Sequence, residues 1–152
     1  MFSKKNNIAE YILHLWQIED YLRAFPEQAD KSKELREISE MMHAEGIIEK
    51  GHLQLAQIAL REMEELHDQL VNTDAIYRAA AMQLAPKLAI LKSKSDNENQ
   101  SDLSMIFVFM YSIMLLNLQK KELSDETLLL KKQAGQLLTY LSRCYRDEKD
   151  SN

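Results

Sequence analysis

Glycine and proline are scarce in this chain. Its 152 residues include three glycines and two prolines, whereas tight turns and β-hairpins depend on these two residue types. The scarcity argues against a turn-rich sheet protein. Leucine, glutamate, lysine, alanine and methionine are abundant instead, and these residues favour helices. Because 45% of the residues are apolar, the chain is able to bury a core, and we expect an all-α fold in a single domain, residues 1–152.

Cysteine is almost absent as well. Cys144 is the single cysteine, so an internal disulfide is excluded and the chain suits a reducing compartment. The N-terminal stretch from Ile8 to Trp16 is interrupted by Glu10 and His14. A secretory signal needs an uninterrupted apolar segment. We therefore predict a cytoplasmic protein.

Basic residues are outnumbered by acidic ones. The chain has 24 aspartates and glutamates against 19 lysines and arginines, which gives a net charge of −5. Proteins that bind nucleic acid normally present a basic face to the phosphates. The charge balance therefore argues against nucleic acid as a partner.

Only one long apolar run is present, from Leu103 to Leu118. Thirteen of its sixteen residues are apolar, but as a helix it reaches roughly 24 Å, short of the ~20 residues that usually cross a bilayer. We predict a soluble helix with no membrane partner. Such a helix must be surrounded by others, so we expect a bundle of five to six helices around a hydrophobic central helix, residues 103–121.

The remaining apolar residues recur at spacings of three and four, which predicts further helices at residues 7–24, 33–45, 52–71 and 74–92, and from Ser124 onward. Pro86 should kink or interrupt the helix at 74–92. Gly46 and Gly51 favour a bend between the second and third helices, although one continuous helix stays open. Residues 92–102 lack apolar side chains and are predicted to form an internal mobile loop, and residues 147–152 a polar tail.

Two Glu-x-x-His motifs, Glu40 to His43 and Glu64 to His67, have the ligand spacing of di-iron helical bundles. If the two helices form a hairpin, the motifs differ in height by roughly 14 Å, and if they are continuous by about 32 Å. A shared metal site is therefore not expected. We interpret both histidines as satisfied or solvated, and we expect His67 to donate to a backbone carbonyl.

No other arrangement of side chains predicts catalysis. Glu19 and Asp20 are adjacent on one helix and point about 100° apart, so they are poorly placed to share a proton. They are candidates for polar contacts with Lys50 or His52. We therefore assign no catalytic, cofactor-binding or metal-binding residues, and no cofactor.

Several short stretches carry a family resemblance: Asn7-Ile8-Ala9-Glu10-Tyr11, Trp16-Gln17-Ile18-Glu19-Asp20, Glu45-Gly46, Lys50-Gly51-His52-Leu53-Gln54 and Leu118-Gln119-Lys120-Lys121-Glu122-Leu123-Ser124. Together they resemble a family of uncharacterised, all-helical bacterial proteins that is filed as a domain of unknown function. The resemblance covers nearly the whole chain. It implies a single helical domain in the bacterial cytoplasm, and it implies no activity.

Two functional hypotheses follow from the central helix, which is apolar on two opposite sides. Met105, Phe109, Ser112 and Leu116 lie on one arc of it, opposite Phe107, Met110 and Met114. The first hypothesis is a non-enzymatic interaction or scaffold protein, in which a second copy of the chain or an unidentified protein covers one arc. The alternative is a small-ligand or metal-binding bundle, which would include an enzyme with an internal cavity.

Overall fold

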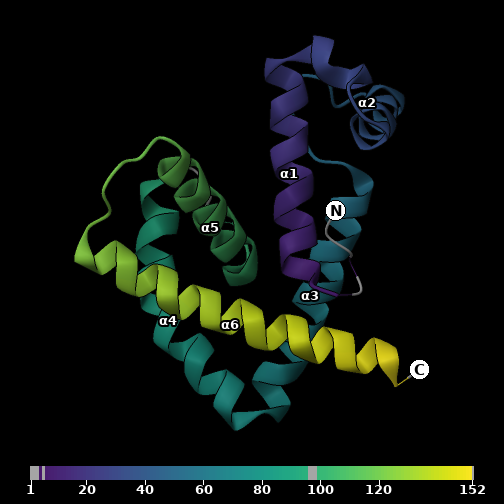
Figure 1. The fold of residues 1–152 in the computed structure, drawn as a ribbon. Helices are drawn as coiled ribbons and strands as arrows, with labels where there is room; N and C mark the ends of the chain where they lie inside the picture. Colours follow the sequence, from purple (N-terminus) through teal and green to yellow (C-terminus); the bar gives the residue numbers. More distant parts are fainter. Residues whose placement is uncertain (1–3, 5, 96–98, 152) are drawn as a thin grey trace. The chain divides into compact units, whose positions relative to one another are not determined.

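A computed structural model describes residues 4, 6–95 and 99–151 of the chain (Figure 1). The described residues form six α-helices and one short 3-10 helix, and they contain no strand. The helices are α1 (Ile8–Ala24), α2 (Lys33–Glu45), α3 (Gln54–Thr73), α4 (Ala75–Lys94), α5 (Asp102–Leu118) and α6 (Asp125–Asp150). The all-α prediction is therefore confirmed.

Contacts divide the chain into two compact units, which we call unit 1 (Met1–Arg61) and unit 2 (Glu62–Asn152). The boundary falls inside α3, which runs from Gln54 to Thr73 without a break. A division by contacts does not determine whether the two units fold as one domain. The single-domain prediction therefore stays a prediction.

Unit 1 is built on α1 and α2, which contact each other and the 3-10 helix at Pro26–Asp30. Asn7, where the sequence predicts the first helix to begin, caps α1 by accepting a hydrogen bond from the Glu10 amide. Ser32 caps α2 in the same way through the Leu35 amide. Each cap satisfies an amide that has no partner inside its helix.

Gly46 ends α2, and α2 and α3 are separate helices. The φ angle of Gly46 is 70°, which is left-handed. Glycine adopts this conformation without a steric penalty. The Ile47 amide then reaches back to the Met42 carbonyl at 3.0 Å and closes the helix end. The link at residues 46–53 is not helical. The predicted bend is confirmed, and a continuous helix is excluded.

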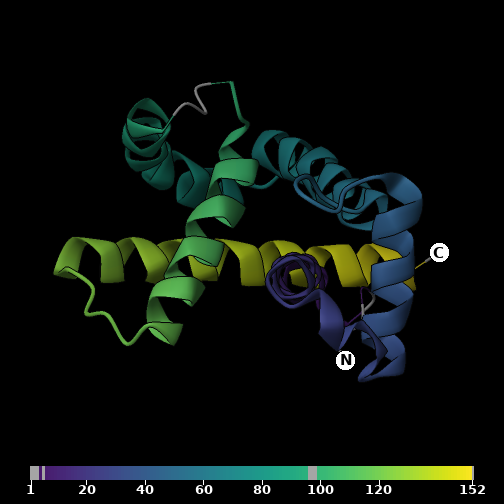
Figure 2. The same cartoon turned by 90° about the horizontal axis from the view of Figure 1, so that it is seen from above.

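Unit 2 contains α4, α5 and α6, each of which contacts the other two. Figure 2 shows α5 crossing α6. The core of the unit comes from buried apolar side chains on all three helices: Tyr77, Leu84 and Leu88 of α4, Leu103, Ile106 and Phe107 of α5, and Leu130, Ala134, Leu137 and Leu141 of α6. Burial of this many large apolar groups is the main favourable term in its folding.

Pro86 does not interrupt its helix, contrary to one of the two alternatives predicted. α4 is continuous from Ala75 to Lys94, with Pro86 in its interior. Proline leaves the carbonyl four residues earlier, that of Met82, without a helical partner. Both Met82 and Pro86 are exposed, so water is able to reach this carbonyl. Packing by Leu84 and Leu88, which are buried on the other side, holds the helix together.

The burial of α5 changes along its length rather than from one arc to the other. Met105, Phe107 and Phe109 in the first half are buried, although they were assigned to opposite arcs. In the second half Ile113 is the only buried residue, and Leu118 is 65% exposed. Because Lys120 adopts a left-handed φ of 57°, the helix ends at Leu118 and not at residue 121. Among the described residues, no helix is both long enough and apolar enough to cross a membrane.

The predicted loop and tail are shorter than expected. α4 continues to Lys94 and α5 begins at Asp102, so both ends of the stretch 92–102 are helical. The Lys92 ammonium contacts the Asp102 carboxylate at 2.5 Å and ties the two ends together. Residues 96–98 lie outside the described residues, and the mobility of the loop stays a prediction. α6 extends through most of the predicted tail, to Asp150, and residue 152 lies outside the described part.

Candidate functional site

A buried carboxylate organises unit 1. Glu19 of α1 is fully buried, and each of its carboxylate oxygens has a partner. Oε1 lies 2.7 Å from Nδ1 of His52, and Oε2 accepts a hydrogen bond of 2.8 Å from the Leu53 amide. A buried carboxylate is tolerated only with such partners. We call Trp16, Glu19, Arg23, His52 and Leu53 the α1 corner.

The imidazole of His52 contacts both Glu19 and Trp16 in this corner. Its ring stacks on the indole of Trp16, with centroids 4.6 Å apart and planes 19° from parallel. Gln57 donates a hydrogen bond to the His52 carbonyl. The predicted contact between Glu19 and His52 is therefore confirmed, while Asp20 pairs with Arg23 on its own helix.

Arg23 fixes the link between α2 and α3. Its guanidinium donates to the carbonyls of Ile47 at 3.0 Å, Ile48 at 3.3 Å and Gly51 at 2.5 Å. Trp16, Glu19 and Arg23 are spaced three and four apart, so one face of α1 carries all three. This face therefore shapes the link, and Glu19 connects it to His52 and to the start of α3.

A cavity of about 340 Å³ lies beside the link in unit 1. Arg23, His43 and Glu49 contribute polar groups to its lining. Nδ1 of His43 is 2.8 Å from the carbonyl of Ser39, and the guanidinium of Arg23 is held by backbone carbonyls. His43 is thus a satisfied histidine, as predicted.

In unit 2, His67 has a different partner from the one predicted. Its Nδ1 lies 2.5 Å from the Tyr77 hydroxyl, not near a backbone carbonyl. Partial burial lowers the pKa of His67, because the imidazolium loses hydration. Sequence periodicity places His67 on an apolar seam but does not reveal which residue of the next helix faces it.

Tyr77 and Tyr140 extend this polar group across α4 and α6. Their rings lie 5.8 Å apart, and the Tyr140 hydroxyl donates to Oδ2 of Asp74 at 2.5 Å. This hydrogen bond lowers the pKa of Asp74 and raises the pKa of Tyr140. Asp74 also caps α4 through the Tyr77 amide. The cluster ties the start of α4 to α6.

The two Glu-x-x-His motifs fall in different units, Glu40 and His43 in unit 1 and Glu64 and His67 in unit 2. Each histidine has a local partner of its own. Within the described ranges, no three His, Cys, Asp or Glu side chains come together as metal ligands.

An apolar groove lies between α4 and α6 of unit 2. It encloses about 420 Å³. Its apolar lining consists of Ile90, Leu91, Phe109, Leu129 and Leu130, with Lys87, Lys94, Glu126 and Thr127 beside them. Ile90 and Leu129 are 54% and 50% exposed. We call this the apolar groove.

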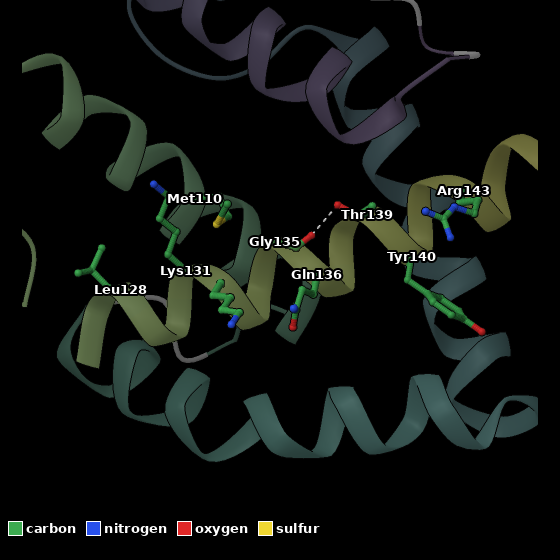
Figure 3. Close-up of a pocket in the computed structure, with 9 residues that line it drawn as sticks. Met110, Leu128, Lys131, Gly135, Gln136, Thr139, Tyr140 and Arg143 are labelled. Atoms are coloured by element: carbon green, nitrogen blue, oxygen red, sulfur yellow. Dashed lines mark hydrogen bonds between the residues drawn. The ribbon is translucent and has the colours of Figure 1, made fainter. Parts of the chain in front are cut away.

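A second groove of about 560 Å³ follows the other flank of α6 (Figure 3). Met110 of α5 and Leu128 and Gly135 of α6 line it together with the cations Lys131, Lys132 and Arg143. Figure 3 shows Met110 beside Gly135, with the other side chains following α6. No aspartate or glutamate contributes to this lining. We call it the basic groove.

Neither groove was predicted from the sequence. The exposed leucines of α6 that line them, Leu128 and Leu129, occur in an ordinary helical pattern. Their exposure depends on which faces α4 and α5 cover, and this is a tertiary property. The sequence offers one signal for the basic groove. Its helical spacing places Lys131, Lys132 and Arg143 on one face with Leu128.

Comparison with known proteins gives one result. The chain matches a family model over residues 2–35 and 26–152, and that family is described as Domain of unknown function (DUF4924). No curated protein and no solved structure matches the chain.

Proposed function

Because the chain belongs to the DUF4924 family, a domain of unknown function, we propose from its surface that it is a non-enzymatic interaction module that binds another protein through unit 2. The observation that carries the proposal is a concentration of exposed large aliphatic side chains. Leu118 at the end of α5, Leu128 and Leu129 near the start of α6 and Ile90 on α4 are all exposed, and Ile90 and Leu129 line the same apolar groove. Exposed apolar surface of this kind is typical of protein interaction sites.

The exposure is large enough to matter. Leu118 is 65% exposed, and Leu128 is 46% exposed. Fully burying a leucine is worth about 1.5–3 kcal/mol, so a partner that covers several of these residues gains a substantial part of a binding free energy. Single exposed leucines are common on protein surfaces. The supporting feature is that Ile90 and Leu129, each about half exposed, line one groove together.

A photo-crosslinking amino acid at Ile90 or Leu129 tests the proposal in the cells that naturally make the protein. We expect a discrete protein adduct from either position. The matched control places the same amino acid at Glu65, which lies exposed on a polar face of α3 and should give no such adduct. Equal labelling from all three positions, or no adduct from Ile90 and Leu129, would refute the proposal.

The alternative of a small-ligand or metal-binding bundle has less support from the α1 corner. The polar groups of the α1 corner are engaged with one another and with backbone atoms. The proposal therefore does not assign catalysis, a cofactor or a metal.

We also propose a bacterial, cytoplasmic setting for this module. Its support is the single cysteine, Cys144, which is free and half-buried. A chain that cannot form an internal disulfide is suited to a reducing compartment.

A further inference from the structure

We infer that the basic groove of unit 2 receives an acidic amphipathic helix of another protein. The inference rests on the proposed function, that unit 2 binds another protein, and goes beyond it by assigning a second contact surface on the other flank of α6 and the chemistry of its partner. Three features of the groove support it: its shape, its unpaired cations and the small apolar strip between them.

The groove is long enough for several turns of a helix. The residues of α6 that line it run from Leu128 to Arg143 at alternating spacings of three and one, which is a single straight face of a helix. This face is roughly 22 Å long, or about four helical turns. Grooves alongside helices bind partner helices through anchors that repeat at the same spacing.

The charge of the groove points to carboxylates. Lys131, Lys132 and Arg143 form no ion pair with any carboxylate in the part of the chain that the structure describes. The chain as a whole has a net charge of −5, so these three unpaired cations stand out locally. Opposite charge on a partner steers association and fixes its register. An acidic helix meets this requirement, and a basic one would be repelled.

The apolar strip completes the match. Leu128 and Met110 provide aliphatic contact, and methionine adapts readily to different partners. Gly135 lies between the cations on α6 and allows close approach. An added Cβ there would meet only the terminal methyl of Met110, at 4.0 Å. A partner therefore needs apolar residues interleaved with its acidic ones.

Two acidic segments of this chain present only part of such a face. In the acidic helix α2, the apolar residues Ile38 and Met42 are buried. In α3, Leu55 and Ile58 are exposed, but they precede the acidic stretch at residues 62–68 and are not interleaved with it. The groove is therefore assigned to a different protein.

The test measures the binding of synthetic peptides to the full-length protein by fluorescence anisotropy. The first peptide is a helix of about 18 residues, matching the groove in length, with leucines on one face and glutamates beside them. The second replaces every glutamate with lysine, and the third replaces every leucine with glutamine. We expect the first to bind at least about tenfold more tightly than either of the others, and added salt to weaken its binding.

Variants of the protein locate the binding site. Lys131→Gln, Lys132→Gln and Arg143→Gln in combination should weaken the acidic peptide at least about tenfold, and Gly135→Phe should do the same by filling the groove. Gly135→Ala is the matched control that leaves the groove open. Circular dichroism verifies that each variant is folded. Unchanged affinity in the triple variant, equal binding of the acidic and basic peptides, or no binding of the acidic peptide would overturn the inference.

Two further measurements separate the competing explanations. Sedimentation of the protein alone detects self-association, and a dimer that the triple variant abolishes would make a second copy the occupant and overturn the inference. Crosslinking from Ile90 and Leu129 tests the proposed function independently. If an adduct forms at these positions but the acidic peptide does not bind, only the chemistry assigned to the partner is refuted. If no adduct forms, the proposed function itself is refuted.

Discussion

At the scale of single residues, Glu19 is the one charged residue that is buried in the described part of the chain. It is fully buried, and its two carboxylate oxygens bind the His52 ring and the Leu53 amide. Leu53 is fully buried, so its amide loses its acceptor inside the protein if the carboxylate is removed. Glu19 therefore connects the start of α3 to α1, in addition to pairing with His52.

Replacing Glu19 with leucine should lower the free energy of unfolding by about 1–3 kcal/mol, because a buried amide is left without an acceptor. Chemical denaturation measures this loss. Asp20→Leu is the control on the same helix, since the pair of Asp20 with Arg23 is partly exposed and should be worth at most about 1 kcal/mol. Equal losses in the two variants would contradict this role for Glu19.

The pKa of His67 predicts a dependence of stability on pH. Burial lowers that pKa below its ordinary value of 6.5, so the folded state binds this proton less readily than the unfolded state. Unfolding is then favoured as the pH falls below about 6.5. We expect His67→Gln to lose less stability than the parent protein between about pH 7.5 and pH 5.5. Denaturation curves at both values measure the difference, and parallel losses would refute the assignment.

At the scale of the element, the glycine in the middle of α6 offers a direct test of the basic groove. Gly135→Ala should raise the free energy of unfolding by about 0.5–1 kcal/mol, because glycine is a poor helix former and the new methyl meets only Met110 at 4.0 Å. Thermal unfolding provides the measurement. Gly46→Ala is the contrasting control: the left-handed φ of 70° at that position should make the same change cost about 1 kcal/mol. A destabilised Gly135→Ala variant would show that the groove is tighter than described.

The helices themselves were predictable where local chemistry sets their ends. Asn7 and Ser124 cap their helices, and Gly46 terminates α2, at positions that the sequence identifies. The effect of Pro86 was less predictable, because tertiary packing decides whether a proline interrupts a helix. The left-handed Lys120 that ends α5 early was not predictable either, since lysine gives no local signal for that conformation.

The candidate sites were harder to predict than the helices. Glu19 and His52 lie far apart in sequence, so the sequence pattern does not select His52 over Lys50 as the partner. The conformation of the link at residues 46–53 determines this contact. Tyr77, as the partner of His67, was missed because a helical pattern shows which side of a helix is buried but not what it meets. The two grooves result from the pairing of α4, α5 and α6, which periodicity does not specify.

At the scale of the whole molecule, the two units should unfold together. α3 runs through their boundary without a break, and helix formation is cooperative along its length. Trp16 is the only tryptophan and lies in unit 1, so its fluorescence reports that unit, while far-ultraviolet circular dichroism reports all helices. We expect coincident denaturation curves from the two signals. Separate midpoints would show two domains and refute the single-domain prediction.

The uneven burial of α5 gives this molecule a helix whose two halves differ in local stability. Amide hydrogen exchange should be slowest around Phe107 and Phe109 and much faster near Leu118, because exposed helix ends open without global unfolding. The last turns of α5 are thus able to open while the core of unit 2 stays closed. A partner that orders them on binding would change the exchange of only these amides, which makes them a built-in reporter of the bound state.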